Sequence, residues 1–347
     1  MAQTRKMCRD TSVDLVKTFA IIGVLLIHTT AGVISSNQSG SLGWYTTLLW
    51  GSVSRASVPL FLMCSGVLFL APEKDLPLKK LWGKYIARIA VALFVWAFFY
   101  KLFHLALEHN FSGTTLLTAI KDVFLFRHET HLYYLHIVLL VYALLPFLRL
   151  LVQYGSKQML QYALLIWFLL GIVYPTVCGY WPFSRLSGIP LQWKLNMTYA
   201  SLGYLLLGYY LKRYPPRKFF AVGCLLAGFT IVFGLTAVFS LQKGSLDSQF
   251  WEGMSVGVCL QAAGIFSLLT LLPTSPILSH TVHFVSKASF CIYLCHMMLL
   301  KLLGMHFSAN WPIPALGIPL LTAATLAGSL VVYLVLSRIP IVNKWLL

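Results

Sequence analysis

Residues 13–34 read VDLVKTFAIIGVLLIHTTAGVI, an apolar run that contains three ionisable side chains, Asp14, Lys17 and His28. A helix that crosses a membrane needs about 20 mostly apolar residues to span about 30 Å of hydrocarbon. Nine further apolar runs follow, near residues 46–70, 86–107, 132–152, 159–176, 196–211, 219–240, 253–272, 288–305 and 314–337. The sequence therefore predicts an all-α integral membrane protein, a polytopic bundle of about ten transmembrane helices in one domain, 1–347.

The composition excludes several other classes of protein. Of the 347 residues, 59% are hydrophobic and only 10% are charged, whereas soluble domains carry about 25% charged residues. An ordinary soluble enzyme, a disordered chain and a disulfide scaffold are therefore ruled out. The seven cysteines form no CxxC pair and lie mostly in apolar runs, so we expect small reduced side chains and no metal site.

The basic residues indicate how the helices are oriented. There are 26 Lys and Arg against 9 Asp and Glu, a net charge of +17, which in a soluble protein would suggest a nucleic-acid partner. With the N-terminus inside, 17 of these 26 bases lie in cytoplasmic segments, from Arg5, Lys6 and Arg9 to Lys344, and seven lie in outer segments. Lys and Arg are retained in cytoplasmic loops. We therefore expect both termini in the cytoplasm and no nucleic-acid partner.

Lys17 and His28 are the first candidate pair, because ionisable groups inside transmembrane helices are costly and often functional. They are eleven residues apart, which corresponds to about 16 Å along an α-helix with an angular offset of about 20°. Both side chains therefore share one stripe, suited to a ligand with an anionic head at the cytoplasm and a thin arm reaching inward. The structural alternative is that Lys17 snorkels to the inner surface and His28 bonds a neighbouring helix.

Arg55 is a second buried ionisable group, about 9 residues from the outer end of its run. It stays charged and needs a carboxylate, a carbonyl or an oxyanion as partner, so structural pairing and function are both open. Pro59 predicts a kink in this helix. Ser65 and Gly66 predict close helix packing through small residues.

Polar side chains also recur near the C-terminal end of the chain and at the outer surface. Ser289, Tyr293 and His296 recur at i, i+4 and i+7, one polar stripe that must face the bundle; it either lines a channel or ties helices together. The outer stretch 108–131 is long enough for a short amphipathic helix and ends in a polar cluster. The candidates there are Glu129, His131 and Tyr133, although an interfacial aromatic belt alone explains the tyrosines.

Five motifs in register resemble the membrane acyltransferase-3 family. They are Lys17-x10-His28, the segment Ser54-Arg55-Ala-Ser57-Val-Pro59, the element His131-Leu-Tyr133-Tyr134, the helix Tyr199-x3-Gly203-Tyr204-x3-Gly208, and Ser289-x2-Ile292-Tyr293-x2-His296. The family often has an Arg-x2-Arg pair at the cytoplasmic start of its third helix. This chain has Lys84-Tyr85-Ile-Ala-Arg88 at that place. Within the family, the chain is most similar to the stand-alone enterobacterial branch that O-acetylates surface polysaccharides such as the common antigen.

The resemblance implies transfer of an acetyl group from cytoplasmic acetyl-CoA to a hydroxyl of a surface or lipid-linked glycan, in the bacterial inner membrane. Lys17, Lys84, Arg88 and Ser289 would then bind the CoA donor, and Glu129, His131 and Tyr133 the acceptor. His28 would act as general base or transient acyl carrier, with Arg55, Tyr293 and His296 in the catalytic site. The alternative is a transporter that exports a glycan or a small anion.

Overall fold

The computed structural model describes residues 10–186, 188–273 and 275–347, and within these ranges it contains helices and no strand. Arg5, Lys6 and Arg9, which belong to the predicted cytoplasmic bases, lie outside the described residues. The first half consists of α1 (Thr11–Ala31), η1 (Ile34–Ser36), α2 (Leu42–Ser54), α3 (Ser57–Leu70), α4 (Leu78–Lys80), η2 (Leu81–Ile86), α5 (Ala87–Leu107), α6 (Gly113–Phe124), η3 (Thr130–Leu132) and α7 (Tyr133–Tyr154).

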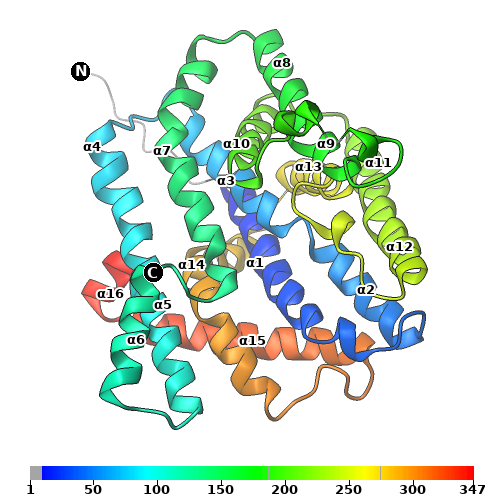
Figure 1. Ribbon diagram of the computed structural model, residues 1–347. Coiled ribbons are helices and arrows are strands. Elements are labelled where there is room, and N and C mark those ends of the chain that lie inside the picture. Colours follow the sequence, from blue (N-terminus) through cyan, green and yellow to red (C-terminus); the bar gives the residue numbers. More distant parts are fainter. Residues whose placement is uncertain (1–9, 187, 274) are drawn as a thin grey trace.

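The second half continues the same all-helical arrangement (Figure 1). Its elements are α8 (Lys157–Trp167), η4 (Phe168–Val173), α9 (Tyr174–Val177), η5 (Phe183–Arg185), η6 (Ile189–Trp193), α10 (Met197–Arg213), α11 (Lys218–Thr230), η7 (Ile231–Leu235), α12 (Thr236–Lys243), η8 (Gln249–Trp251), α13 (Val256–Leu271), α14 (Pro276–Gly304), α15 (Pro314–Leu336) and α16 (Pro340–Trp345).

Nine helical segments of the described chain are long and apolar enough to cross a membrane. The predicted bundle of about ten is therefore confirmed except for residues 196–211. These form α10, whose 17 residues extend about 26 Å at 1.5 Å per residue, less than the hydrocarbon thickness of about 30 Å. The predicted orientation and the single domain remain predictions.

The segment Leu42–Leu70 is broken, as Pro59 predicts. Helix α2 ends at Ser54, a turn carries Arg55 and Ala56, and α3 begins at Ser57. Pro59 has no N–H to continue the helical hydrogen bonds, and its ring crowds the preceding turn. The Ser57 hydroxyl instead donates to the Ser54 carbonyl at 2.6 Å. The break places Arg55 between two helices rather than on a regular helix face.

Helix α1 lies inside the bundle and contacts α2, α3, α13, α14 and α15. The buried Asp14 carboxylate accepts a hydrogen bond from Ser286 of α14 at 2.6 Å and lies 3.3 Å from the His283 ring. The Thr18 hydroxyl donates to the Val282 carbonyl at 3.0 Å. Buried polar groups need such partners, so these contacts fix the stripe of Lys17 and His28 against α14.

Small residues allow α3 and α10 to cross at very short range. A Cβ atom at Gly66 would lie 1.9 Å from the Leu205 carbonyl oxygen, and one at Gly208 would lie 2.3 Å from the Met63 carbonyl oxygen. The predicted close packing at Gly66 is therefore confirmed. Ser65 donates to the Phe61 carbonyl at 3.1 Å.

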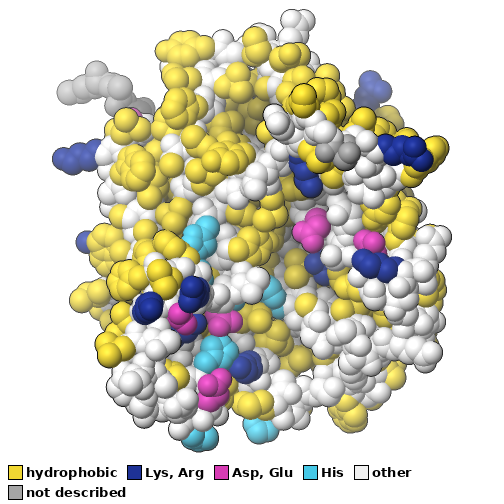
Figure 2. Space-filling view, viewed as in Figure 1, with side chains coloured by type: hydrophobic (Ala, Val, Ile, Leu, Met, Phe, Trp, Pro, Cys, Tyr) yellow, Lys and Arg dark blue, Asp and Glu magenta, His cyan; other side chains and the backbone are white. Residues whose placement is uncertain are grey.

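The surface carries few charged side chains among many apolar ones, as expected for lipid contact (Figure 2). One patch of basic, acidic and histidine side chains lies over α5 and α6, and it includes the pair Lys101–Asp122 at 3.1 Å. Helix α6 itself is the short amphipathic helix expected in 108–131. The six cysteines that the structure describes are free, as predicted.

Candidate active site

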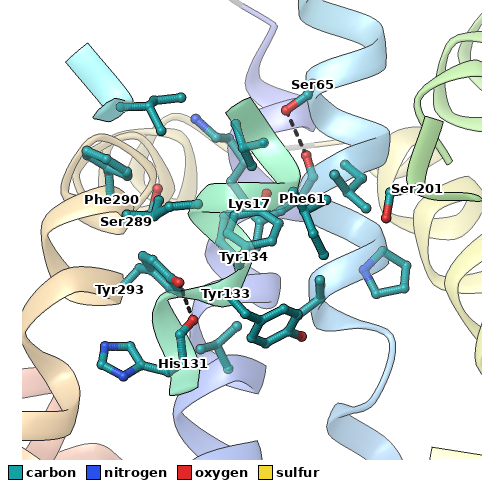
Figure 3. Close-up of a pocket in the computed structure, with 18 of the residues that line it drawn as sticks. Lys17, Phe61, Ser65, His131, Tyr133, Tyr134, Ser201, Ser289, Phe290 and Tyr293 are labelled. Carbon is teal, nitrogen blue, oxygen red and sulfur yellow. Dashed lines mark hydrogen bonds between the residues drawn. The ribbon is translucent and has the colours of Figure 1, made fainter. Parts of the chain in front are cut away.

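One cavity of about 620 Å³ lies inside the bundle between α1, α3, α5, α7 and α14. Most of the site residues predicted from the sequence line it together: Lys17, His28, Arg55, Arg88, His131, Tyr133, Ser289 and Tyr293. They come from segments far apart in the chain, and Figure 3 shows several of them around the same space. The tertiary structure therefore joins motifs that the sequence presents separately.

One end of the cavity is cationic. Lys17 of α1, Arg88 of α5 and the exposed Lys287 of α14 line it. The Arg88 guanidinium carbon lies 5.6 Å from the centre of the Phe290 ring, and its Nε has no hydrogen-bond partner within the described residues. Three cations from three helices form a site that can hold phosphate groups through charge-assisted hydrogen bonds.

Further positive charge lies beside this end. Burial lowers the pKa of Lys74, in the loop before α4, and the neighbouring charges of Lys80, Arg149 and Lys84 lower it further. The Arg149 guanidinium is held by the Phe69 and Lys74 carbonyls, each at 2.5 Å. Because like charges crowd here, this surface favours an anionic ligand over a cationic one.

Three histidines meet toward the other end of the cavity. The ring centroid of His28 lies 5.0 Å from that of His296 and 6.2 Å from that of His131, and the His131 and His296 centroids are 5.4 Å apart. His28 and His131 line the cavity, and His296 lies fully buried behind them. No group of His, Cys, Asp and Glu side chains in the described ranges is arranged to hold a metal ion.

The buried His296 has a fixed hydrogen-bonding pattern. Its Nδ1 lies 2.7 Å from the Tyr293 carbonyl oxygen, so this nitrogen carries the proton and donates. Its Nε2 is then an acceptor, buried and without a hydrogen-bond partner in the part of the chain that the structure describes. The closest neighbouring rings are those of His28 and His131.

The polar stripe of α14 faces the bundle, as predicted. Ser289, Tyr293 and His296 are 4%, 7% and 0% exposed. The Tyr293 hydroxyl donates to the His131 carbonyl at 2.5 Å (Figure 3), and the Ser289 hydroxyl donates to the Ser286 carbonyl at 2.8 Å. The stripe therefore does both things considered from the sequence, because Ser289 and Tyr293 line the cavity while the tyrosine ties α14 to η3, the turn that precedes α7.

Arg55 enters the cavity from the break between α2 and α3. Its guanidinium carbon lies 3.9 Å from the centre of the Trp251 ring, a cation–π contact. Its Nε is buried and has no hydrogen-bond partner among the described residues. A buried guanidinium with unused donors can bind an oxyanion that forms in front of it.

Two predicted residues lie elsewhere. Lys84 is exposed outside the cavity lining, and Tyr85 lines the cavity in its place. Glu129 contacts the His104 ring at 2.7 Å, and His104 in turn contacts Lys301 at 3.0 Å, also outside the cavity lining. Their proposed roles in binding the donor and the acceptor stay predictions.

Sequence reasoning missed several residues of the cavity wall, and those most relevant to its chemistry are Lys287, Trp251 and Glu252. Lys287 lies two residues before Ser289, and its place among the predicted cytoplasmic bases already explains its charge. Glu252 is an acidic residue at the start of the apolar run 253–272, a signal that the sequence does contain. Trp251 gives no such signal, because an interfacial aromatic residue has an ordinary explanation.

Comparison with known families identifies the group to which this site belongs. A family model described as an acyltransferase domain matches residues 10–334, almost the whole chain. The chain belongs to this membrane acyltransferase family. Comparison with curated proteins and with solved structures gives no significant match. The family assignment supports acyltransferase activity in a multi-pass membrane protein and agrees with the resemblance of the five motifs.

Proposed function

We propose that the protein transfers an acetyl group from cytoplasmic acetyl-CoA to a hydroxyl of a surface or lipid-linked glycan. One observation carries this proposal: a single cavity joins the cations Lys17, Arg88 and Lys287 to His28 and Arg55. The family of the chain supplies acyl transfer as the type of reaction. The enterobacterial resemblance supports the bacterial inner membrane as its location and surface polysaccharide as the acceptor.

The donor would bind with its nucleotide end at the cationic mouth. Acetyl-CoA carries several phosphates on one end and a thioester at the tip of a long, thin arm. Lys17 and Arg88 would hold the phosphates, and Lys287 adds a third cation. The arm would follow α1 over the distance of about 16 Å that separates Lys17 from His28 along the helix, which brings the thioester to the histidines.

His28 would then promote transfer by one of two routes. As a general base, it takes the proton of the acceptor hydroxyl while the hydroxyl oxygen attacks the thioester carbonyl. The tetrahedral intermediate collapses, the C–S bond breaks, and the CoA sulfur leaves with a proton from His28. As an acyl carrier, a His28 nitrogen itself attacks the thioester carbonyl, the C–S bond breaks, and CoA leaves as the thiolate. The acceptor hydroxyl oxygen then attacks the acetyl carbonyl, the C–N bond to His28 breaks, and the hydroxyl proton passes to the released His28 nitrogen.

Arg55 would stabilise the negative charge that develops on the carbonyl oxygen in either route. Its guanidinium is held by Trp251 and is largely withdrawn from water. A preorganised donor in such a site typically contributes about 2.7–4 kcal/mol to the transition state. Loss of this donor is therefore expected to lower kcat by about a hundredfold or more.

The test measures acetyl transfer by the intact protein in proteoliposomes. Acetyl-CoA is added on the side of the membrane to which the cationic end of the cavity opens, and surface glycan is the acceptor. His28→Ala should abolish both CoA release and glycan acetylation. His280→Ala is the matched control, because His280 is exposed on α14 outside the cavity. Full transfer by the His28→Ala protein would refute the central role of this residue.

A transporter is the second candidate, because the helix pair α2–α3 is broken beside a buried arginine. Transporters bind ligands at broken helices of this kind. Such a protein would move a glycan or a small anion across the membrane of the proteoliposome in the absence of acetyl-CoA. Transport that needs no acetyl-CoA, together with absent glycan acetylation, would favour this function over acyl transfer.

A further inference from the structure

Among the described residues that line the cavity, Glu252 is the one acidic side chain, and it accompanies four cationic side chains. The Glu252 side chain is exposed. Glu252 lies close enough to the Arg55 guanidinium and the Tyr133 hydroxyl to interact electrostatically with both. The acidic group at the reactive end of the cavity is therefore Glu252, whereas Glu129 pairs with His104.

The segment that carries Glu252 is held on several sides. The Trp251 Nε1 donates to the Ser52 hydroxyl at 3.1 Å, and the Tyr204 hydroxyl donates to the Gly253 carbonyl at 2.6 Å. The Ser255 hydroxyl caps α13 and donates to the Phe250 carbonyl at 2.9 Å. Backbone contacts on both sides of residue 252 thus fix the place from which the carboxylate projects, as a binding residue requires.

The surroundings of Glu252 are suited to a sugar. Tyr133 lines the same end of the cavity and is 41% exposed, so its ring offers an apolar surface next to polar groups. An ionised carboxylate only accepts hydrogen bonds, and its two oxygens can accept from two donors at once. Neighbouring hydroxyls of a sugar ring supply such a pair of donors.

The charge of Glu252 also sets the class of sugar. The Arg55 guanidinium is largely withdrawn from water beside Trp251, so an acceptor that approaches this end meets the exposed carboxylate of Glu252 first. A uronic acid or another anionic sugar would place a like charge there, which is costly. A neutral sugar meets hydrogen-bond acceptors and an aromatic face.

We propose that Glu252 binds the acceptor, and that it selects a neutral sugar by accepting hydrogen bonds from two neighbouring hydroxyls while one of them is presented to His28. This inference rests on the proposed acetyl transfer. It gives the binding of the acceptor to a residue that lies outside the five motifs shared with the acyltransferase family.

The experiment compares three soluble acceptors in proteoliposomes of the full chain with acetyl-CoA: methyl glucoside, methyl glucuronide and cyclohexanol. We expect the unmodified protein to acetylate the glucoside at least tenfold better than the glucuronide in kcat/KM. Glu252→Gln keeps the size of the side chain and removes its charge. It should raise KM for the glucoside about tenfold, which corresponds to about 1.4 kcal/mol, and narrow the preference over the glucuronide.

Cyclohexanol distinguishes direct binding of the acceptor by Glu252 from an indirect effect of Glu252 on Arg55. It has one hydroxyl and no second donor for Glu252, so Glu252→Gln should leave its acetylation unchanged. An effect that acted through Arg55 would instead lower kcat for all three acceptors. Asp247→Asn is the matched control, since Asp247 is an acid of the same segment that lies 3.9 Å from Lys243, and we expect no change of preference.

Two outcomes would overturn the proposal. One is an equal loss for glucoside, glucuronide and cyclohexanol in Glu252→Gln. The other is no transfer to either glycoside by protein that still releases CoA from acetyl-CoA. Failure of the proposed function is distinct, because then no CoA would be released and His28→Ala would have no effect.

Discussion

Replacing Gly66 by Ala adds one methyl group where α3 crosses α10. The new Cβ would lie 1.9 Å from the Leu205 carbonyl oxygen and 2.6 Å from its carbonyl carbon. Ordinary van der Waals contact begins near 3.4 Å, so the two helices must separate by about 1.5 Å at this point. Both contact atoms belong to the backbone of α10, so no side-chain rotation can relieve the overlap.

The expected cost is that of overpacking a well-packed core, about 1–3 kcal/mol or more. The separation also moves the cavity wall, because Phe61 and Ser65 of α3 line the cavity. We therefore expect Gly66→Ala to lower both the midpoint of unfolding and the rate of acetyl transfer. Circular dichroism during heating in detergent micelles and CoA release in proteoliposomes measure the two effects.

Gly223→Ala is the matched control on α11, because nothing lies within 4 Å of a Cβ at that position. Alanine has a higher helix propensity than glycine by about 1 kcal/mol, so this variant should be as stable as the unmodified protein or more stable. Equal stability of the Gly66→Ala and Gly223→Ala proteins would refute the reasoning. Gly208→Ala, which meets the Met63 carbonyl at 2.3 Å, should resemble Gly66→Ala.

Three further predictions follow from single contacts. Lys287→Met should raise KM for acetyl-CoA about tenfold and leave kcat nearly unchanged, because a hydrogen bond to a charged group contributes about 1.5–3 kcal/mol. Steady-state kinetics at two salt concentrations test this prediction. Tyr293→Phe removes the hydrogen bond to the His131 carbonyl and should lower the free energy of unfolding by about 1–3 kcal/mol, measured by denaturation in micelles; no loss would show that water replaces the bond. Burial raises the pKa of Asp10, but the hydrogen bonds from Lys212 and Ser12 and the charge of Lys212 together outweigh burial and hold the pKa below 3.8. These contacts therefore stabilise the fold above pH 3.8, and their contribution is lost as the pH falls through the lower folded value. The stability difference between the unmodified protein and Asp10→Asn should therefore vanish in strong acid, and a constant difference would contradict it.

Much of the candidate site was predictable because its residues violate the rules of a membrane segment. Lys17, His28 and Arg55 are costly in hydrocarbon, so each indicates a cavity or a partner, and each lines the same cavity. The i, i+4, i+7 spacing puts Ser289 and Tyr293 on one face of α14. Because polar side chains are unfavourable against lipid, the sequence predicts that this face points into the bundle. Glu252 was missed because it directly precedes the apolar run 253–272, and a charge is inexpensive at the edge of a membrane segment.

The sequence by itself determined the all-helical membrane class, the approximate helices and the stripe shared by Lys17 and His28, because these depend on local hydropathy and helical periodicity. Only the tertiary structure decided that Arg55 stands in a break beside Trp251, that His296 lies next to His28, and that Lys287 and Glu252 line the same cavity. The reason is physical. Periodicity fixes the face on which a side chain lies, whereas its neighbours depend on how distant helices pack, down to the glycines that let α3 meet α10.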